Sequence, residues 1–301
     1  MEKQNKFVKD MTKGNPMQLL IQFSLPLLVG NIFQQLYNMV DSIIVGNFVG
    51  ANALGAIGTT NSLNFFFFSL VAGLSVGIGI IVAQYFGFGD EEKVKDAIGN
   101  SIWIITVCSV IMAIIGFVTA RPILVLLDTD PVILNDAVAY LKVVSIGIVC
   151  VGFYNGVSGI LRALGDSKTP LIFLIVASVL NVILDLIFVL SFGWGVVGAG
   201  VATAFSQLIS ALACIIYAYK SNTYFKLKKK NIKLNGNIIK KSCKLGIPVA
   251  LQNSLIAFSL IVLQKVVNGY GATFTTAFTV VSRIETLVQQ PFMSLGAAVS
   301  T

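Results

Sequence analysis

Long apolar runs without alternation of apolar and polar positions dominate the chain. A helix needs about 20 apolar residues to cross roughly 30 Å of hydrocarbon. Eight stretches have this length, at approximately 17–48, 54–86, 94–119, 132–161, 169–192, 195–219, 244–268 and 272–301. Continuous runs are not the pattern of membrane strands, which alternate. The sequence therefore predicts an all-α polytopic membrane protein with about eight transmembrane helices in this chain.

Charged residues are scarce and gather at the ends of these runs. Only 11% of the residues are charged and 56% are hydrophobic, whereas a soluble domain has about 25% charged residues. Of the 21 Lys and Arg residues, 17 lie in the N-terminal segment or in the loops after spans two, four and six. The positive-inside rule then places the N-terminus in the cytoplasm. We interpret the net charge of +8 as a topology signal of a multi-pass inner-membrane protein and expect no nucleic-acid partner.

The composition also limits the chemistry of the chain. It contains no histidine, which excludes a Ser-His-Asp relay and metal or haem sites held by histidine. Its four cysteines form no CxxC motif and are typical of reduced thiols. An intramembrane protease could use Asp41 and Asp185 as paired catalytic acids, but neither of them lies in a GxGD-type motif. We therefore expect no enzyme, no catalytic residues and no cofactor.

An internal repeat divides the chain. The segment FSLPLLVGN (23–31) resembles LGIPVALQN (245–253), and a second pair of segments gives the same period of about 221 residues. This period predicts an N-lobe at 1–219, a basic cytoplasmic linker at 220–243 and the start of a C-lobe at 244–301. Because the second unit holds only two spans, we expect a fragment of a protein of about 440 residues and about twelve spans. A chain that naturally ends here is the alternative.

One face of the first span is polar and ends in a carboxylate. Five side chains recur there at helical spacing: Asn31, Gln34, Gln35, Asn38 and Asp41. We assign the four amides to a substrate cavity, with hydrogen bonding between helices as the alternative. Pro26 lies just before this face and removes a backbone hydrogen bond, so we expect a conformational kink there.

Spans five and six offer further oxygen ligands. Asn181 and Asp185 lie one turn apart on one face of span five, and Thr203 lies in the small-residue helix that follows. At about 1.5 Å per residue, these residues and Asp41 reach similar depths in the outer half of the membrane. A carboxylate at the bilayer centre costs about 2.5–3.5 kcal/mol on insertion scales, so such acids are functional candidates. Asp41, Asn181, Asp185 and Thr203 are therefore a predicted coupling site, for bound Na⁺ or for a proton shared between the acids.

Five segments together resemble the multidrug and toxic compound extrusion (MATE) family. They are SLPLLVGNIFQQLYNMVDSIIVG (24–46), GLSVGIGIIVAQYFG (73–87), RALGDSKTP (162–170), NVILDLIFV (181–189) and GAGVAT (198–203). The resemblance implies two six-helix lobes around a V-shaped cavity. It also implies export of organic cations driven by inward Na⁺ or H⁺. The DinF-like prokaryotic branch is the nearest match, and its N-lobe cation site falls on the four residues selected above. The NorM-like branch has an acid in span seven, which this chain lacks.

These inferences together predict a secondary active multidrug exporter. It would antiport amphipathic or cationic organic compounds against Na⁺ or H⁺ by alternating access, as a monomer surrounded by membrane lipids. The alternative is a lipid-linked oligosaccharide flippase of the same superfamily. Such a flippase needs a basic lining for pyrophosphate, and spans one to six offer only Lys142 as a base within a span.

Overall fold

The computed structural model describes residues 16–127 and 129–268, together with residues 281, 285–286, 288–296 and 298–299. Helices make up nearly all of this part. Their bounds are α1 (Pro16–Phe48), α2 (Ala51–Gly87), α3 (Glu91–Leu126), α4 (Pro131–Ala163), α5 (Lys168–Asp185), the π-helix η1 (Leu186–Ser191), α6 (Gly195–Ser221), the 3₁₀ helix η2 (Thr223–Phe225) and α7 (Gly236–Asn268). Seven of the helical segments described are long and apolar enough to cross a membrane. The all-α, multi-pass fold and the first seven predicted spans are thus confirmed, whereas the predicted span 272–301 falls largely outside the described residues.

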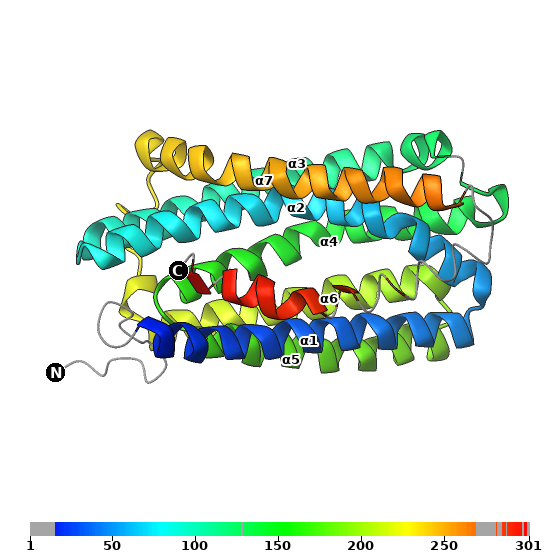
Figure 1. Cartoon of the computed structure of the whole chain (residues 1–301), viewed down its shortest axis with the longest axis horizontal. Helices are drawn as coiled ribbons and strands as arrows, with labels where there is room; N and C mark the ends of the chain where they lie inside the picture. Colours follow the sequence, from blue (N-terminus) through cyan, green and yellow to red (C-terminus); the bar gives the residue numbers. More distant parts are fainter. Residues whose placement is uncertain are drawn as a thin grey trace.

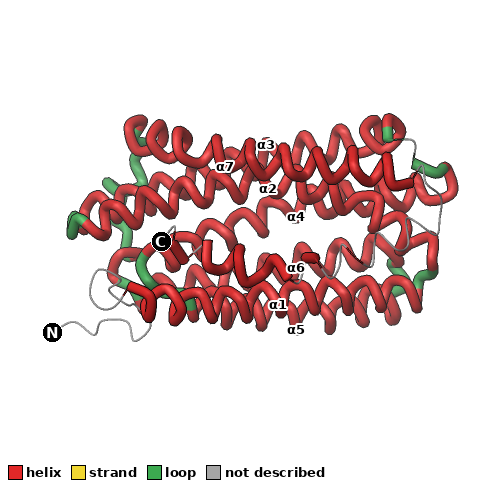
Figure 2. Tube along the Cα trace, in the orientation of Figure 1, coloured by secondary structure: helices red, strands yellow, loops and turns green. Residues whose placement is uncertain are grey.

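The long helices lie side by side and run alternately in opposite directions (Figure 1). The turns at 88–90 and 164–167 and the segment 222–235 lie at the end where α1 begins. Figure 2 shows helices joined by loops, with no strand in the part of the chain that is described. The predicted grouping of the basic loops at one end of the bundle is therefore present in the fold.

Helices α2 and α4 form the centre of the bundle. Helix α2 packs against α4 and α7, α4 packs against α3 and α6, and α5 lies between α1 and α6. Buried apolar clusters fill these contacts, one of them around Ile78, Val82 and Leu161. Because lipid is as apolar as these side chains, close packing rather than the hydrophobic effect holds such helices together in a bilayer.

Two glycines allow α7 to approach α2 closely. A Cβ atom at Gly73 would lie 2.4 Å from the backbone of Ala250, and one at Gly77 would lie 2.5 Å from the backbone nitrogen of Gly246. Any side chain at these two positions would separate the helices. The GxxxG spacing on α2 is thus a close-packing device.

The ends of the helices follow local capping chemistry. The Asp90 carboxylate accepts a hydrogen bond of 3.1 Å from the backbone N–H of Lys93 and caps α3. Helix α7 begins at Gly236, inside the predicted linker 220–243, because the Asn235 side chain accepts a 3.1 Å hydrogen bond from the N–H of Asn237. Helix α1 continues through Pro26, and a kink at this residue stays a prediction.

Candidate functional site

Three helices bring the predicted coupling residues together. Asp41 lies on α1, Asn181 and Asp185 lie on α5, and Thr203 lies on α6. Asn181 and Asp185 are 1% and 0% exposed. The side-chain amide of Asn181 donates a hydrogen bond of 3.4 Å to the Thr203 hydroxyl oxygen. The carboxyl groups of Asp41 and Asp185 lie close enough to interact electrostatically.

Several oxygens of this group have no donor. Among the described side chains, Asp41 Oδ1, Asn181 Oδ1 and both carboxylate oxygens of Asp185 are buried without a hydrogen-bond partner. Two buried carboxylates in contact repel each other and lose hydration, so the pair favours a shared proton or a bound cation. Carboxylate and amide oxygens are also the ligands that hard cations take in proteins. The arrangement thus fits either a shared proton or a bound Na⁺.

The backbone changes from an α-helix to a π-helix directly after Asp185. Helix α5 ends at this residue and continues as the π-helix η1. A Cβ atom at Gly198 would lie 3.2 Å from the backbone of Phe188, so α6 begins in close contact with η1. π-Helical turns are rare in proteins, and those that do occur are often found at functional sites. No sequence pattern predicted this turn, because it depends on how α5 and α6 meet.

Sequence reasoning missed two tyrosines beside the acid pair. The phenol groups of Tyr37 and Tyr140 lie close enough to interact electrostatically with both Asp41 and Asp185. Tyr37 precedes Asp41 by one helical turn and shares its face, so its spacing could have identified it. Tyr140 comes from α4 and had no comparable signal.

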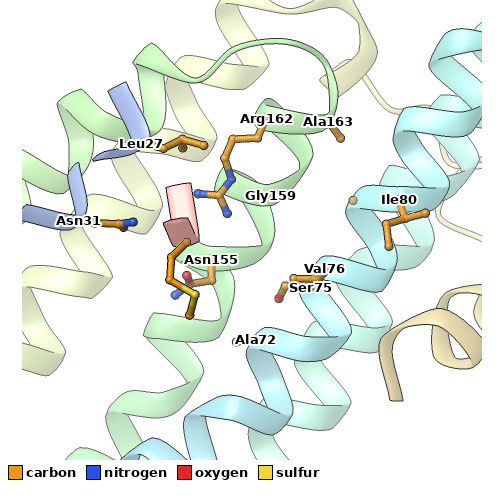
Figure 3. A pocket seen from close by; sticks show the side chains of 12 residues that line it. Leu27, Asn31, Ala72, Ser75, Val76, Ile80, Asn155, Gly159, Arg162 and Ala163 are labelled. Carbon is orange, nitrogen blue, oxygen red and sulfur yellow. The ribbon is translucent and has the colours of Figure 1, made fainter. Parts of the chain in front are cut away.

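A cavity of about 430 Å³ lies apart from the acid pair, between α1, α2 and α4 (Figure 3). Its lining consists of Leu27, Asn31, Ala72, Ser75, Val76, Gly79, Ile80, Asn155, Gly159, Arg162, Ala163 and Met293. Of the four amides assigned to a substrate cavity, Asn31 lies here, and its amide donates a hydrogen bond of 3.2 Å to the Ser294 hydroxyl. Gln34, Gln35 and Asn38 are not among the lining residues of this cavity, and their role stays a prediction.

Arg162 has a different place from the one expected. The sequence predicts a loop residue after span four, whereas Arg162 lies in the last turn of α4 and its guanidinium group projects into the cavity (Figure 3). Packing and capping decide where a helix ends, and a local sequence pattern does not show them. The sequence therefore predicted a loop for the RALGD segment, although α4 includes its first two residues. Lys142 is therefore not the only base within spans one to six, and that prediction was wrong. Lys142 itself lies over the ring of Phe117, 5.0 Å from its centroid.

Comparisons with known proteins agree with the fold. The model of the MatE family matches residues 26–187. The chain is 33% identical to "Probable multidrug resistance protein YpnP" of Bacillus subtilis, over 97% of this chain and 65% of that protein. It is 26% identical to "Multidrug export protein MepA" of Staphylococcus aureus, over 92% of this chain and 62% of that protein.

A solved structure described as "Outward-facing conformation of a multidrug resistance MATE family transporter of the MOP superfamily" matches with a TM-score of 0.90. The sequence identity is 27%, and the match covers 99% of this chain and 66% of that one. The chain thus spans slightly less than two thirds of the length of these relatives.

Proposed function

The chain belongs to the MatE family, and from this premise we propose that the full-length protein is a secondary active multidrug exporter. It antiports amphipathic or cationic organic compounds against Na⁺ or H⁺. The family assignment and the export names of the relatives support a transporter rather than an enzyme. The observation that carries the proposal is the proximity of Asp41 and Asp185, whose buried oxygens have no donor among the described residues.

In this proposal the acid pair is the coupling site of the DinF-like kind. A proton or Na⁺ held by Asp41, Asn181, Asp185 and Thr203 neutralises the pair and favours close packing of α1 on α5. Loss of the ion restores repulsion between the carboxylates and favours a different packing of α1. Pro26, inside α1, removes one backbone hydrogen bond and lowers the cost of bending.

The proposed organisation keeps the two lobes and the linker. Residues 1–219 form the N-lobe, 220–243 the cytoplasmic linker and 244–301 the start of the C-lobe, with the N-terminus in the cytoplasm. The position of the basic loops at one end of the bundle supports this orientation. The protein acts as a monomer in contact with membrane lipids.

A transport assay on the full-length protein tests the proposal. Proteoliposomes preloaded with a fluorescent cationic dye receive a Na⁺ gradient or a pH gradient, imposed separately. We expect dye movement driven by one of the two gradients, and at least about a tenfold loss in Asp185→Asn, which removes the charge on which coupling depends. The matched control is Asp136→Asn, which changes an exposed carboxylate on α4 and should retain the wild-type rate.

Two results would contradict the proposal. Undiminished, gradient-driven export in well-inserted Asp185→Asn would remove the acid pair from the coupling mechanism. A well-inserted wild type that moves no dye under either gradient would exclude drug export of this class. The lipid-linked oligosaccharide flippase would then be the next hypothesis, because Arg162 gives the cavity a basic group. Rescue of a flippase-deficient strain would support that alternative.

A further inference from the structure

The guanidinium group of Arg162 has no acidic partner in the described part of the chain. It forms no ion pair and donates no hydrogen bond there, although it lies in the last turn of a membrane-spanning helix. Asp166 is the acid next along the chain, but its carboxylate accepts hydrogen bonds from the hydroxyl of Thr169 (2.6 Å) and from the backbone of Thr169 (2.9 Å) and Lys168 (3.2 Å). Charged groups inside a membrane protein are normally paired or face a pathway. Among the described residues, the cavity is therefore the place where Arg162 is open to a partner.

The groups around Arg162 complete a polar corner in this cavity. Asn155 lies seven residues earlier on the same face of α4. One hydrogen of its amide goes to the backbone oxygen of Val151 (2.8 Å), which leaves the second hydrogen for another acceptor. Gly159 lies between them without a side chain: a Cβ atom there would lie 4.0 Å from the Arg162 guanidinium and 3.5 Å from the backbone oxygen of Ser75. This glycine keeps the space between α4 and α2 open.

The rest of the lining is apolar. Leu27, Val76 and Ile80 face the same cavity (Figure 3), as does Met293. A volume of about 430 Å³ falls in the range of about 300–1,000 Å³ that holds drug-sized ligands. A guanidinium group presents its donors as a planar fork that matches a carboxylate or phosphate. A polar corner of donors beside apolar walls fits a molecule with an oxyanion at one end and an apolar body.

We propose that Arg162 and Asn155 form a binding site for the oxyanion of an amphipathic molecule. The inference rests on the proposed export function in one respect, because an exported substrate that carries an oxyanion would place it at this site. The site is separate from the coupling site, since neither Asp41 nor Asp185 lines the cavity. The two sites also have opposite charge, so cations and oxyanions can be held at different places in one transporter.

A pair of dyes that differ only in the oxyanion tests this site. One is a rhodamine with a free carboxylate, and the other is its methyl ester, which keeps the cationic ring system. The dissociation constants are measured by fluorescence anisotropy on the purified full-length transporter, without any gradient. We expect Arg162→Gln to weaken binding of the carboxylate dye at least about tenfold and that of the ester less than about twofold. Arg121→Gln, an exposed arginine on α3, is the control and should change neither value.

Two further variants keep the test decisive if Arg162→Gln fails to fold. Arg162→Lys keeps the charge and loses the fork, and Asn155→Ala removes the second donor. Each should weaken binding of the carboxylate dye several-fold more than binding of the ester. Equal losses for the two dyes, or no loss for either, would overturn the proposal, because Arg162 would then support only packing. The binding assay needs no ion coupling, so failure of gradient-driven export would leave this result unaffected.

The source of the oxyanion is resolved by two further measurements. Native mass spectrometry of the wild type and Arg162→Gln would detect a co-purifying phospholipid. A phospholipid that is lost in the variant, and is displaced by the carboxylate dye from the wild type, would support the site with a lipid phosphate as its oxyanion. Displacement of the dye by inorganic phosphate at equal concentration would overturn the requirement for an amphipath.

Discussion

At the scale of single residues, the Asn181–Thr203 contact holds the amide of Asn181 beside the acid pair. The Thr203 hydroxyl accepts the Asn181 amide hydrogen at 3.4 Å, while Asn181 Oδ1 has no donor. The hydrogen bond therefore fixes which end of the amide is available to a coupling ion. A buried amide that loses this acceptor is left with an unpaired donor, at a cost of about 1–3 kcal/mol.

Replacing Thr203 by valine tests this role. Thr203→Val keeps the shape of the side chain and removes its oxygen, so Asn181 is free to rotate and the site loses a ligand. We expect the ion concentration for half-maximal dye export to rise about tenfold, which corresponds to about 1.4 kcal/mol. The control is Thr59→Val on α2, where the exposed hydroxyl donates a hydrogen bond to the backbone oxygen of Gly55. An unchanged ion dependence in Thr203→Val would remove Thr203 from the coupling site.

Spacing along the sequence predicted some of these neighbours and missed others. Asn181 and Asp185 could be paired from sequence because residues four apart share a helix face. The meeting of Asp41 with Asp185 followed from their similar depth in the membrane. Tyr140 and Arg162 could not be found in this way. Their places depend on which helices pack together and on where α4 ends, and neither is encoded in a local pattern.

At the scale of elements, hydrogen bonds connect the segment after η2 to α3. The Asn231 amide donates a hydrogen bond of 2.7 Å to Asp96, and the Asn100 side chain accepts one of 2.8 Å from the N–H of Asn235. The indole N–H of Trp103 donates to the backbone oxygen of Ile232 at 2.8 Å. Sequence composition indicated only a solvated basic linker here. The structure shows that asparagine and tryptophan side chains hold it in place, together with an ion pair of 2.7 Å between Lys230 and Glu92 on α3.

Gly99 on α3 has no room for a side chain, because the segment after η2 packs directly against it. A Cβ atom there would lie 2.1 Å from the backbone oxygen of Asn231. We expect Gly99→Ala to push the segment off α3 and to destabilise the protein by about 1–3 kcal/mol. Thermal unfolding in detergent and the rate of trypsin cleavage within 226–233 would measure the effect.

The matched control for this prediction is Gly58→Ala. A Cβ atom at Gly58, within α2, meets no atom within 4 Å. Alanine is also the better helix former by about 1 kcal/mol, so this variant should be neutral or more stable. Equal stability and equal trypsin resistance in Gly99→Ala and Gly58→Ala would show that the segment does not need its close contact with α3.

At the scale of the whole molecule, the up-and-down order of the helices brings the basic loops to one end of the bundle. The segment 222–235 and the turns at 88–90 and 164–167 lie at one end, and the turns at 49–50 and 192–194 lie at the other (Figure 1). The first seven spans and their alternation followed from hydropathy, because only helices satisfy every backbone group inside a bilayer. Hydropathy did not predict which helices pack together, because a lipid tail and a neighbouring helix are equally apolar surroundings for a side chain.

The proposed orientation can be measured with single cysteines in a chain whose four native cysteines are replaced by alanine. Lys229 is exposed in the segment after η2, and Val132, at the start of α4, is 70% exposed at the opposite end. A membrane-impermeant maleimide added to intact cells should label Val132→Cys and not Lys229→Cys, and inverted vesicles should give the reverse. The basic loops set this result, because Lys and Arg near the ends of spans are retained in the cytoplasm. Labelling of Lys229→Cys in intact cells would invert the orientation and place the predicted outer-half coupling residues in the inner half of the membrane.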